Sequence, residues 1–249
     1  MDFIVLGSGS LCAALGKNAR NPAGYALVLK RETLLFDLGF GALTQLARSG
    51  TPPESVSRVF LSHRHPDHVG DLPALLFRYR YAEPRRTALL RLYGPRGFRG
   101  FFERLRRAHH PWLNPRGYRI ELEELEGGAV VRGPGWAVRC REVPHSTQAL
   151  AFRFDSSEGS LCYSGDTGFD GGLAGFARGT GLFAVECSLD KERSDLAHLS
   201  AAQALALGRA SGAKRVLLTH LTRESERTLS RMRLRRNERK ASDLLRVRL

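Results

Sequence analysis

The chain has 249 residues, 42% of them hydrophobic, and its 39 Lys and Arg against 25 Asp and Glu give a formal net charge of +14. This apolar content is that of a globular protein, and the length allows one large α/β domain or two small ones. No run of about eighteen apolar residues occurs, which argues against a membrane span. The first residues enter a strand directly, without the basic and apolar regions of a signal peptide, so we expect a cytoplasmic protein.

Strands open the first half of the chain, and helices follow them. Val59-Phe60-Leu61 is a short apolar run typical of a buried strand, whereas Pro66 and Asp67 carry helix-start chemistry. The predicted elements are strands at 2–6, 25–30 and 33–37, a helix near 41–49, a strand at 58–62, a helix from 67 to about 80, a strand near 88–93 and a helix near 97–108.

The second half repeats this plan. Its predicted elements are strands near 118–124, 136–142, 149–154, 160–164 and 182–186, a helix at 200–211, a strand at 215–219, a helix at about 223–233 and a strand near 244–248. Strands outnumber helices and meander in pairs, which leaves the helices to cover the outside. We therefore predict an α/β fold of two mixed sheets flanked by helices, an αββα sandwich.

A cluster of metal-binding residue types follows the strand at 58–62. In His63-Arg64-His65-Pro66-Asp67-His68, three imidazoles and a carboxylate lie within six positions. These groups suit divalent metals such as zinc, manganese and iron. Four donors this close in sequence could not easily all face one ion, so the spacing suggests a site shared by two metals. A surface cluster of histidines is the alternative, but such a pattern seldom arises by chance.

This cluster resembles the H-x-H-x-D-H signature of the metallo-β-lactamase-fold hydrolases. The resemblance runs nearly end to end, because further segments match the family in chain order, each at the end of an apolar strand. These segments are Phe3–Ser10, Leu34–Gly39, Val143–Ser146, Tyr163–Gly168 and Leu217–His220. Each later match is weak alone, and their order makes them strong together.

The resemblance implies a centre with two divalent metal ions, zinc in the first instance and manganese as the alternative. Seven ligands are implied: His63, His65 and His145 at one ion, Asp67, His68 and His220 at the other, and Asp166 as the bridge. Asp67 would also orient or deprotonate the attacking water, and Asp37 would support a ligand by a hydrogen bond. Because the ligands span residues 63 to 220, we predict one domain over 1–249.

Within this family the chain is most similar to ribonuclease Z and its shorter relatives. The stretch Asp195–Ala204 resembles their His-[LS]-[ST]-x-x-Gln-Ala segment, with Ser200 as the expected N-cap of a helix. Val185-Glu186-Cys187 occupies the place of their His-Glu-Ala sequence. The resemblance implies that Glu186 orients His198, and that His198 donates a proton to the leaving oxygen. The alternative is that His198 only packs against or caps the helix.

One departure from ribonuclease Z concerns the long arm that grips tRNA. In typical members this arm lies between the equivalents of His145 and Asp166, but here only twenty residues separate these positions. They read as a strand, a turn at 156–159 and a strand, which leaves no room for the arm. The hydrolytic centre is therefore expected without the device for typical tRNA 3′-end maturation.

Arginine supplies most of the positive charge and concentrates in two segments, Arg78–Arg119 and Arg223–Arg248. Guanidinium groups bind phosphate bidentately and stack on bases, so a basic and aromatic surface fits a nucleic-acid partner. Coding bias and simple solvation explain such segments equally well. His109 and His110, in the first segment, match no motif and are expected to be solvated.

Three functions follow from these observations. The first is a metal-dependent phosphodiesterase that acts on RNA or another nucleic acid through a metal-bridging hydroxide. The second keeps the metals but hydrolyses a small substrate, such as a cyclic nucleotide, a cyclic phosphate or another ester. The third is a nucleic-acid-binding module that has lost catalysis, against which the intact ligand set argues. The oligomeric state stays open, although the related enzymes are commonly homodimers.

Overall fold

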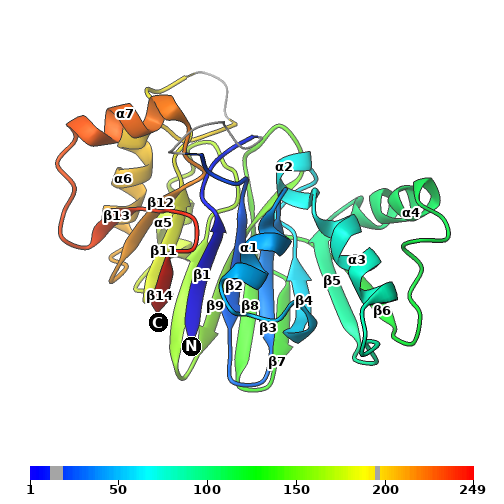
Figure 1. Cartoon of the computed structure of the whole chain (residues 1–249). Helices are drawn as coiled ribbons and strands as arrows, with labels where there is room; N and C mark the ends of the chain where they lie inside the picture. The colour runs from blue at the N-terminus through cyan, green and yellow to red at the C-terminus, as the bar shows by residue number, and fades with distance from the viewer. Residues whose placement is uncertain (12–18, 194–196) are drawn as a thin grey trace.

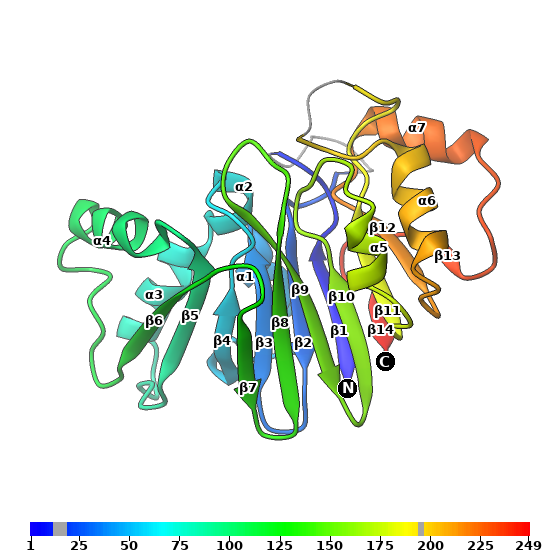
Figure 2. The same ribbon diagram turned by 180° about the vertical axis from the view of Figure 1, so that it is seen from behind.

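Two β-sheets lie face to face at the centre of the molecule, and helices cover their outer faces (Figure 1, Figure 2). This arrangement is seen in a computed structural model that describes residues 1–11, 19–193 and 197–249. The predicted αββα sandwich is thereby confirmed.

Each sheet has seven strands in the described part of the chain. The first contains, in spatial order, β14 (Arg246–Arg248), β1 (Asp2–Gly7), β2 (Gly24–Val28), β3 (Thr33–Leu38), β4 (Val56–Phe60), β5 (Leu90–Pro95) and β6 (Ile120–Leu125). The second contains β13 (Glu238–Lys240), β12 (Val216–Thr219), β11 (Leu182–Glu186), β10 (Gly159–Tyr163), β9 (Ala149–Ser156), β8 (Trp136–Val143) and β7 (Val130–Gly133).

The helices divide between the two outer faces. On the side of the first sheet lie α1 (Ala42–Arg48), the short 3-10 helix Pro53–Ser55, α2 (Pro66–Val69), α3 (Leu72–Tyr81) and α4 (Phe98–Ala108). On the side of the second lie α5 (Gly172–Phe176), α6 (Ala201–Ala210) and α7 (Arg223–Arg231). None of the helices in the described ranges has the length and apolar content that crossing a lipid bilayer requires.

Alternating side chains of each strand separate the apolar interior into layers. Phe3 and Val5 of β1 point between the sheets, whereas Ile4 and Leu6 of the same strand pack under the helices of the first sheet. On β10, Tyr163 joins the layer between the sheets and Cys162 packs toward the helices of the second sheet. Because both faces of these strands are buried, they read in sequence as nearly continuous apolar runs.

The helix predicted from 67 to about 80 is in fact two helices, α2 and α3, interrupted at Gly70 and Asp71. A Cβ on Gly70 would lie 2.4 Å from the ring of Phe40, so the chain passes this ring too closely for a side chain. The Asp71 carboxylate accepts the Leu43 N–H at 2.9 Å, and Pro73 in the first turn of α3 favours a new helix start. The interruption separates the turn that carries His68 from the helix that covers the sheet.

The sequence also missed three short elements, β7, α5 and β13. The strand β13 (Glu238–Lys240) is polar and pairs with β12 at the edge of the sheet, so no apolar alternation marks it. The helix α5 (Gly172–Phe176) contains two glycines, which disfavour a helix in isolation. Pairing and packing with neighbours, rather than local preference, form these elements.

Candidate metal centre

The predicted site residues gather where strands of both sheets end. His63 and His65 follow β4 of the first sheet, and α2 carries Asp67 and His68. In the second sheet, His145, Asp166 and His220 follow β8, β10 and β12, and Glu186 is the last residue of β11. His198 precedes α6, while Asp195 and Leu196 of the same predicted segment lie outside the described residues. Donors far apart in sequence thus come together where these strands end, along the edge of the sandwich at which α2 lies (Figure 1).

The imidazoles of His63, His65 and His145 converge, and we call these three residues the first group. The Nδ1 atom of His65 lies 3.0 Å from His63 Nε2 and 3.3 Å from His145 Nε2. The Nδ1–H of His145 donates to the Ala197 carbonyl at 2.7 Å, so its Nε2 carries a lone pair. Ser62 Oγ donates to Asp37 Oδ2 at 2.7 Å and accepts from His63 Nδ1 at 3.0 Å, so His63 Nε2 also carries a lone pair.

A second group forms around His68 and His220. Their Nε2 atoms lie 3.3 Å apart, and each ring has its Nδ1–H engaged elsewhere. His68 Nδ1 donates to Asp37 Oδ2 at 2.8 Å, and His220 Nδ1 donates to Ser188 Oγ at 2.8 Å. Asp67 Oδ2 lies 3.8 Å from His68 Nε2 and 3.5 Å from His220 Nε2. With both rings neutral, which is the form that binds a metal, two lone pairs and a carboxylate face one another.

Asp166 lies between the two groups. Its Oδ2 is 3.2 Å from His68 Nε2, 3.3 Å from His220 Nε2 and 3.7 Å from His63 Nε2. Its Oδ1 is buried without a hydrogen-bond partner, a costly state for a carboxylate oxygen. Asp166 belongs to the group of His63, His65 and His145, and it also forms a third group with His198 and His220; the potential ligand atoms within each group lie within 4.8 Å of one another.

This donor set fits two divalent cations. Lone pairs that face one another repel, and a buried oxygen without a hydrogen-bond partner loses its solvation. A cation between these atoms would remove both costs. Imidazole nitrogens together with carboxylates are the donors that zinc and manganese accept. Both groups share Asp166 as the carboxylate nearest to both. The residues present therefore fit a candidate site for divalent metal ions.

The protonation states agree with ligation in the first group. Burial lowers the pKa of His63 well below its ordinary value, and it also lowers the pKa of His65 and His145. Neutral imidazole is the form that binds a metal. Burial alone would lower the pKa of His68, but the charges of Asp166 and Asp37 outweigh it and hold that pKa well above the ordinary value.

Asp37 fixes the orientation of His68 and of the loop that follows β4 by hydrogen bonds. Its carboxylate accepts the Ser62 N–H at 2.6 Å, the Ser62 hydroxyl, the Tyr163 hydroxyl at 2.6 Å and His68 Nδ1–H. Asp37 and His220 both have positive φ, 56° and 55°, a strained backbone conformation for residues other than glycine. The surrounding contacts hold this strain at the two points where the chain leaves a strand to present these side chains.

A carboxylate–imidazole pair lies beside the two groups. Glu186 Oε1 accepts from His198 Nδ1 at 2.8 Å, and Nδ1 of His198 is 4.0 Å from Asp166 Oδ2. Burial alone would lower the pKa of His198, but the hydrogen bond and charge of Glu186 raise it to about 9. Ser200, rather than His198, is the N-cap of α6, where its hydroxyl accepts from Gln203 N–H. The His198 side chain stays 28% exposed, so the ring is open to a substrate.

Hydroxyl groups and one backbone N–H that the sequence did not indicate contact the candidate ligands and the residues that support them. Ser188 Oγ lies 2.8 Å from Glu186 Oε2 and 2.8 Å from His220 Nδ1, which links the pair to a candidate ligand. Tyr163 reaches Asp37 across 126 positions of sequence. The Leu11 N–H donates to Asp67 Oδ2 at 3.0 Å. No motif marks Ser188, although it directly follows Glu186 and Cys187.

A family model described as "Beta-lactamase superfamily domain" matches residues 32–221, about three quarters of the chain. The chain belongs to this superfamily. The matched range begins just before β3 and ends just beyond His220, so it includes every candidate ligand of the two groups.

Within the superfamily the chain is similar to ribonuclease Z of Methanothermobacter thermautotrophicus, with 28% identity over 284 positions, 92% of this chain and 89% of that protein. Because this chain has only 249 residues, the relative carries segments that this chain lacks. Two solved structures have the same fold. One is the metallo-beta-lactamase fold protein YhfI of Bacillus subtilis, with a TM-score of 0.83 and 19% identity, and the other is human tRNase Z, short form, with a TM-score of 0.80 and 22% identity. Each match covers 99% of this chain and 98% of the other chain.

Proposed function

We propose that the protein is a dinuclear metal-dependent phosphodiesterase, with zinc as its native metal and RNA as its substrate class. The observation that carries this proposal is the pair of donor groups with Asp166 Oδ2 close to imidazoles of both, and the Glu186–His198 pair beside them. Similarity to a ribonuclease Z over most of both chains supports phosphodiester chemistry.

Two bound divalent ions would lower the pKa of a water molecule and neutralise charge that develops on the phosphate. The remaining roles belong to side chains of this chain. Burial alone would raise the pKa of Asp67, but its interaction with His220 lowers it, so Asp67 stays ionised and orients the attacking water through its carboxylate oxygens. His198 donates a proton to the leaving oxygen, and Glu186 fixes the orientation of its ring.

Three further statements belong to the proposal. The donors come from both sheets, which supports one hydrolase domain over residues 1–249. An enzyme that acts on RNA would work in the cytoplasm. Similarity to ribonuclease Z supports a homodimer, which analytical ultracentrifugation of the purified chain tests.

A second candidate function keeps the chemistry and changes the substrate. Only the hairpin of β9 and β10 lies between His145 and Asp166, and its turn is formed by Ser156 to Gly159. No arm that could hold a folded tRNA is present in this described stretch. This favours a small phosphodiester, such as a cyclic nucleotide or a cyclic phosphate, as the alternative substrate.

One panel of substrates tests both candidates. Bis-p-nitrophenyl phosphate, RNA with a 3′ trailer, cyclic nucleotides and a carboxylic ester are assayed with zinc and with manganese. We expect metal-dependent turnover of the phosphodiesters, with RNA favoured at low salt. Turnover of the carboxylic ester alone would contradict phosphodiesterase function, and turnover of cyclic nucleotides without RNA cleavage would establish the second candidate.

A further inference from the structure

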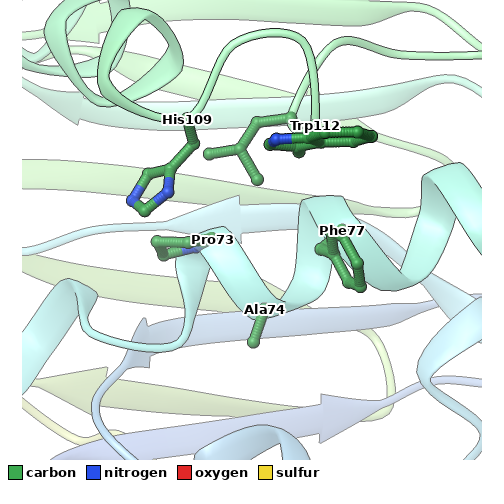
Figure 3. Close-up of a pocket in the computed structure, with 6 residues that line it drawn as sticks. Pro73, Ala74, Phe77, His109 and Trp112 are labelled. Carbon is green, nitrogen blue, oxygen red and sulfur yellow. The ribbon is translucent and has the colours of Figure 1, made fainter.

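An apolar slot lies between α3 and the turn that follows α4, outside the metal centre. It is a shallow depression of about 270 Å³ that is open to solvent, and it is lined by Pro73, Ala74 and Phe77 of α3 and by His109, Trp112 and Leu113 of the turn. Figure 3 shows His109 and Trp112 opposite Pro73 and Phe77 across this space. Pockets for drug-sized ligands begin at about 300 Å³, so this slot suits a single ring system.

The slot exposes aromatic surface that the fold does not require. Phe77 is 50% exposed and Trp112 53% exposed, and Tyr81, one helical turn beyond Phe77, is 43% exposed. The Phe77 and Tyr81 rings are 4.8 Å apart between centroids. The opposite face of α3 supplies the core contacts through Leu72, Leu75, Leu76 and Tyr79. A cluster of exposed large aromatics of this kind indicates a binding surface.

Hydrogen bonds hold the two walls in place. Arg80 of α3 donates to the Asn114 carbonyl at 2.7 Å, and Arg106 of α4 donates to Asn114 Oδ1 at 3.0 Å. Leu113 is buried in the layer beneath. Asn114 therefore ties the turn to both helices, and the aromatic surfaces need little reordering to receive a ligand.

The surroundings of the slot are cationic. Residues 96–119 contain seven arginines against one acidic residue, Glu103, which pairs with Arg106. Arg104 and Arg107 on α4 are exposed, as are Arg116 and Arg119 beyond the turn. An apolar slot lined by ring faces and edged by guanidinium groups complements a nucleobase with its phosphates, because bases stack on aromatic rings and arginine binds phosphate.

Two connections along the chain link the slot to the candidate metal centre. Pro73 is five residues after His68, so their Cα atoms lie at most about 19 Å apart. Arg64, between His63 and His65, donates to the Gly97 carbonyl at 3.4 Å, where α4 begins. A cation of the metal-binding loop thus contacts the start of the helix whose far end forms the slot.

We propose that this slot binds one unpaired base of an RNA strand whose scissile phosphodiester occupies the metal centre, a proposal that rests on the function proposed above. Trp112 and Phe77 supply the ring faces, and the arginines of α4 hold the flanking phosphates. The slot takes over part of the substrate binding for which the β9–β10 hairpin is too short.

Trp112→Ala and Phe77→Ala test the proposal, because both side chains are exposed and their loss leaves the core intact. Each change is expected to raise KM for a single-stranded RNA about tenfold, the size of one lost base stack. Trp112→Phe should retain most of the affinity. Val130→Ala, a change at an exposed apolar residue of β7, is the matched control and should leave KM unchanged.

Two further measurements separate this proposal from its foundation. Bis-p-nitrophenyl phosphate carries no nucleobase for the slot to bind, so its turnover should be equal in the wild type and in Trp112→Ala. If the wild type does not hydrolyse it with either metal, the proposed function fails. If it does, but Trp112→Ala cleaves RNA with wild-type KM, the slot proposal alone fails.

Binding can also be read without catalysis. The chain has two tryptophans, and Trp136 is buried, so quenching of exposed Trp112 by a short oligouridylate reports stacking. Arg104→Gln with Arg107→Gln should lower the salt dependence of this binding by about 0.7 in log–log slope for each cation removed. No quenching, together with a dimer that Trp112→Ala converts to monomer, would identify the slot as a surface for a second copy and overturn the proposal.

Discussion

The candidate metal centre and the slot beside α4 differ in how their side chains are held. At the centre most of the imidazoles are fixed by a hydrogen bond on their second ring nitrogen, as His68 is by Asp37 and His220 by Ser188, and these two rings are buried. In the slot, Phe77 and Trp112 make no hydrogen bond that fixes them, and half of each side chain is exposed. The difference suggests a division of labour, in which a rigid polar site does the chemistry and an apolar surface selects the substrate.

Replacing the shared carboxylate is expected to have the largest effect. Asp166→Asn should remove most of both ions, because each donor group loses its common anion, and lower turnover of bis-p-nitrophenyl phosphate by at least about 10⁴-fold. Elemental analysis and steady-state kinetics measure the two effects. Asp155→Asn, which alters a surface ion pair with Arg153, is the control. Normal metal content in Asp166→Asn would contradict the bridging position.

His198→Gln should separate proton transfer from metal binding. We expect turnover of RNA to fall by about 10²–10³-fold, the usual value of a positioned general acid, with the metal content unchanged. A substrate with a good leaving group, such as bis-p-nitrophenyl phosphate, should be affected much less. His110→Gln, at an exposed histidine, is the control. Equal losses with both substrates would show that His198 does not protonate the leaving oxygen.

Ser188→Ala is expected to weaken metal binding by about tenfold, because the hydroxyl fixes the ring of His220 from its Nδ1 side. Competition with a fluorescent chelator measures the affinity. Ser211→Ala removes another buried hydroxyl, which bonds only to the backbone of α6 and the following loop, and should have no such effect. An unchanged metal affinity in Ser188→Ala would show that the contact of Ser188 with His220 does not contribute to metal binding.

Glu186→Gln should move the basic limb of the pH–rate profile. A general acid works in its protonated form, so activity is present below the pKa of His198 and is lost as the pH rises through it. The hydrogen bond and charge of Glu186 raise that pKa against the effect of burial, so their loss should shift the limb to lower pH. Glu158→Gln, at an exposed turn, should leave the profile in place. A shift to higher pH would contradict the assigned pair.

Both the sandwich and the candidate ligands could be predicted from the sequence, because each leaves a local pattern of residues. His63 to His68 are contiguous, and His145, Asp166 and His220 each follow an apolar strand. The hydroxyl groups that orient them leave no such pattern, since the contact of Tyr163 with Asp37 depends on how two sheets pack. The interruption between α2 and α3 was missed because it depends on the ring of Phe40.

The slot, like the hydroxyl contacts, could not be predicted from the sequence. In the sequence, Trp112 is one of the aromatic residues of the basic segment Arg78–Arg119, and His109 is expected to be solvated. Its side chain is exposed as expected, but it also forms a wall of the slot. What makes these residues a site is the approach of a turn to the exposed face of α3, which no spacing in the sequence indicates.

The contacts of Asp37 carry a consequence for folding as well as for catalysis. Asp37 belongs to a strand of the first sheet, yet it accepts from Tyr163 of the second, and the donors of each ion group come from both sheets. Any ion bound there joins the two halves of the sandwich and adds its binding free energy to their association. Metal supply would then set the thermal stability of the protein as well as its rate, and a cell short of metal would lose the folded protein together with the activity.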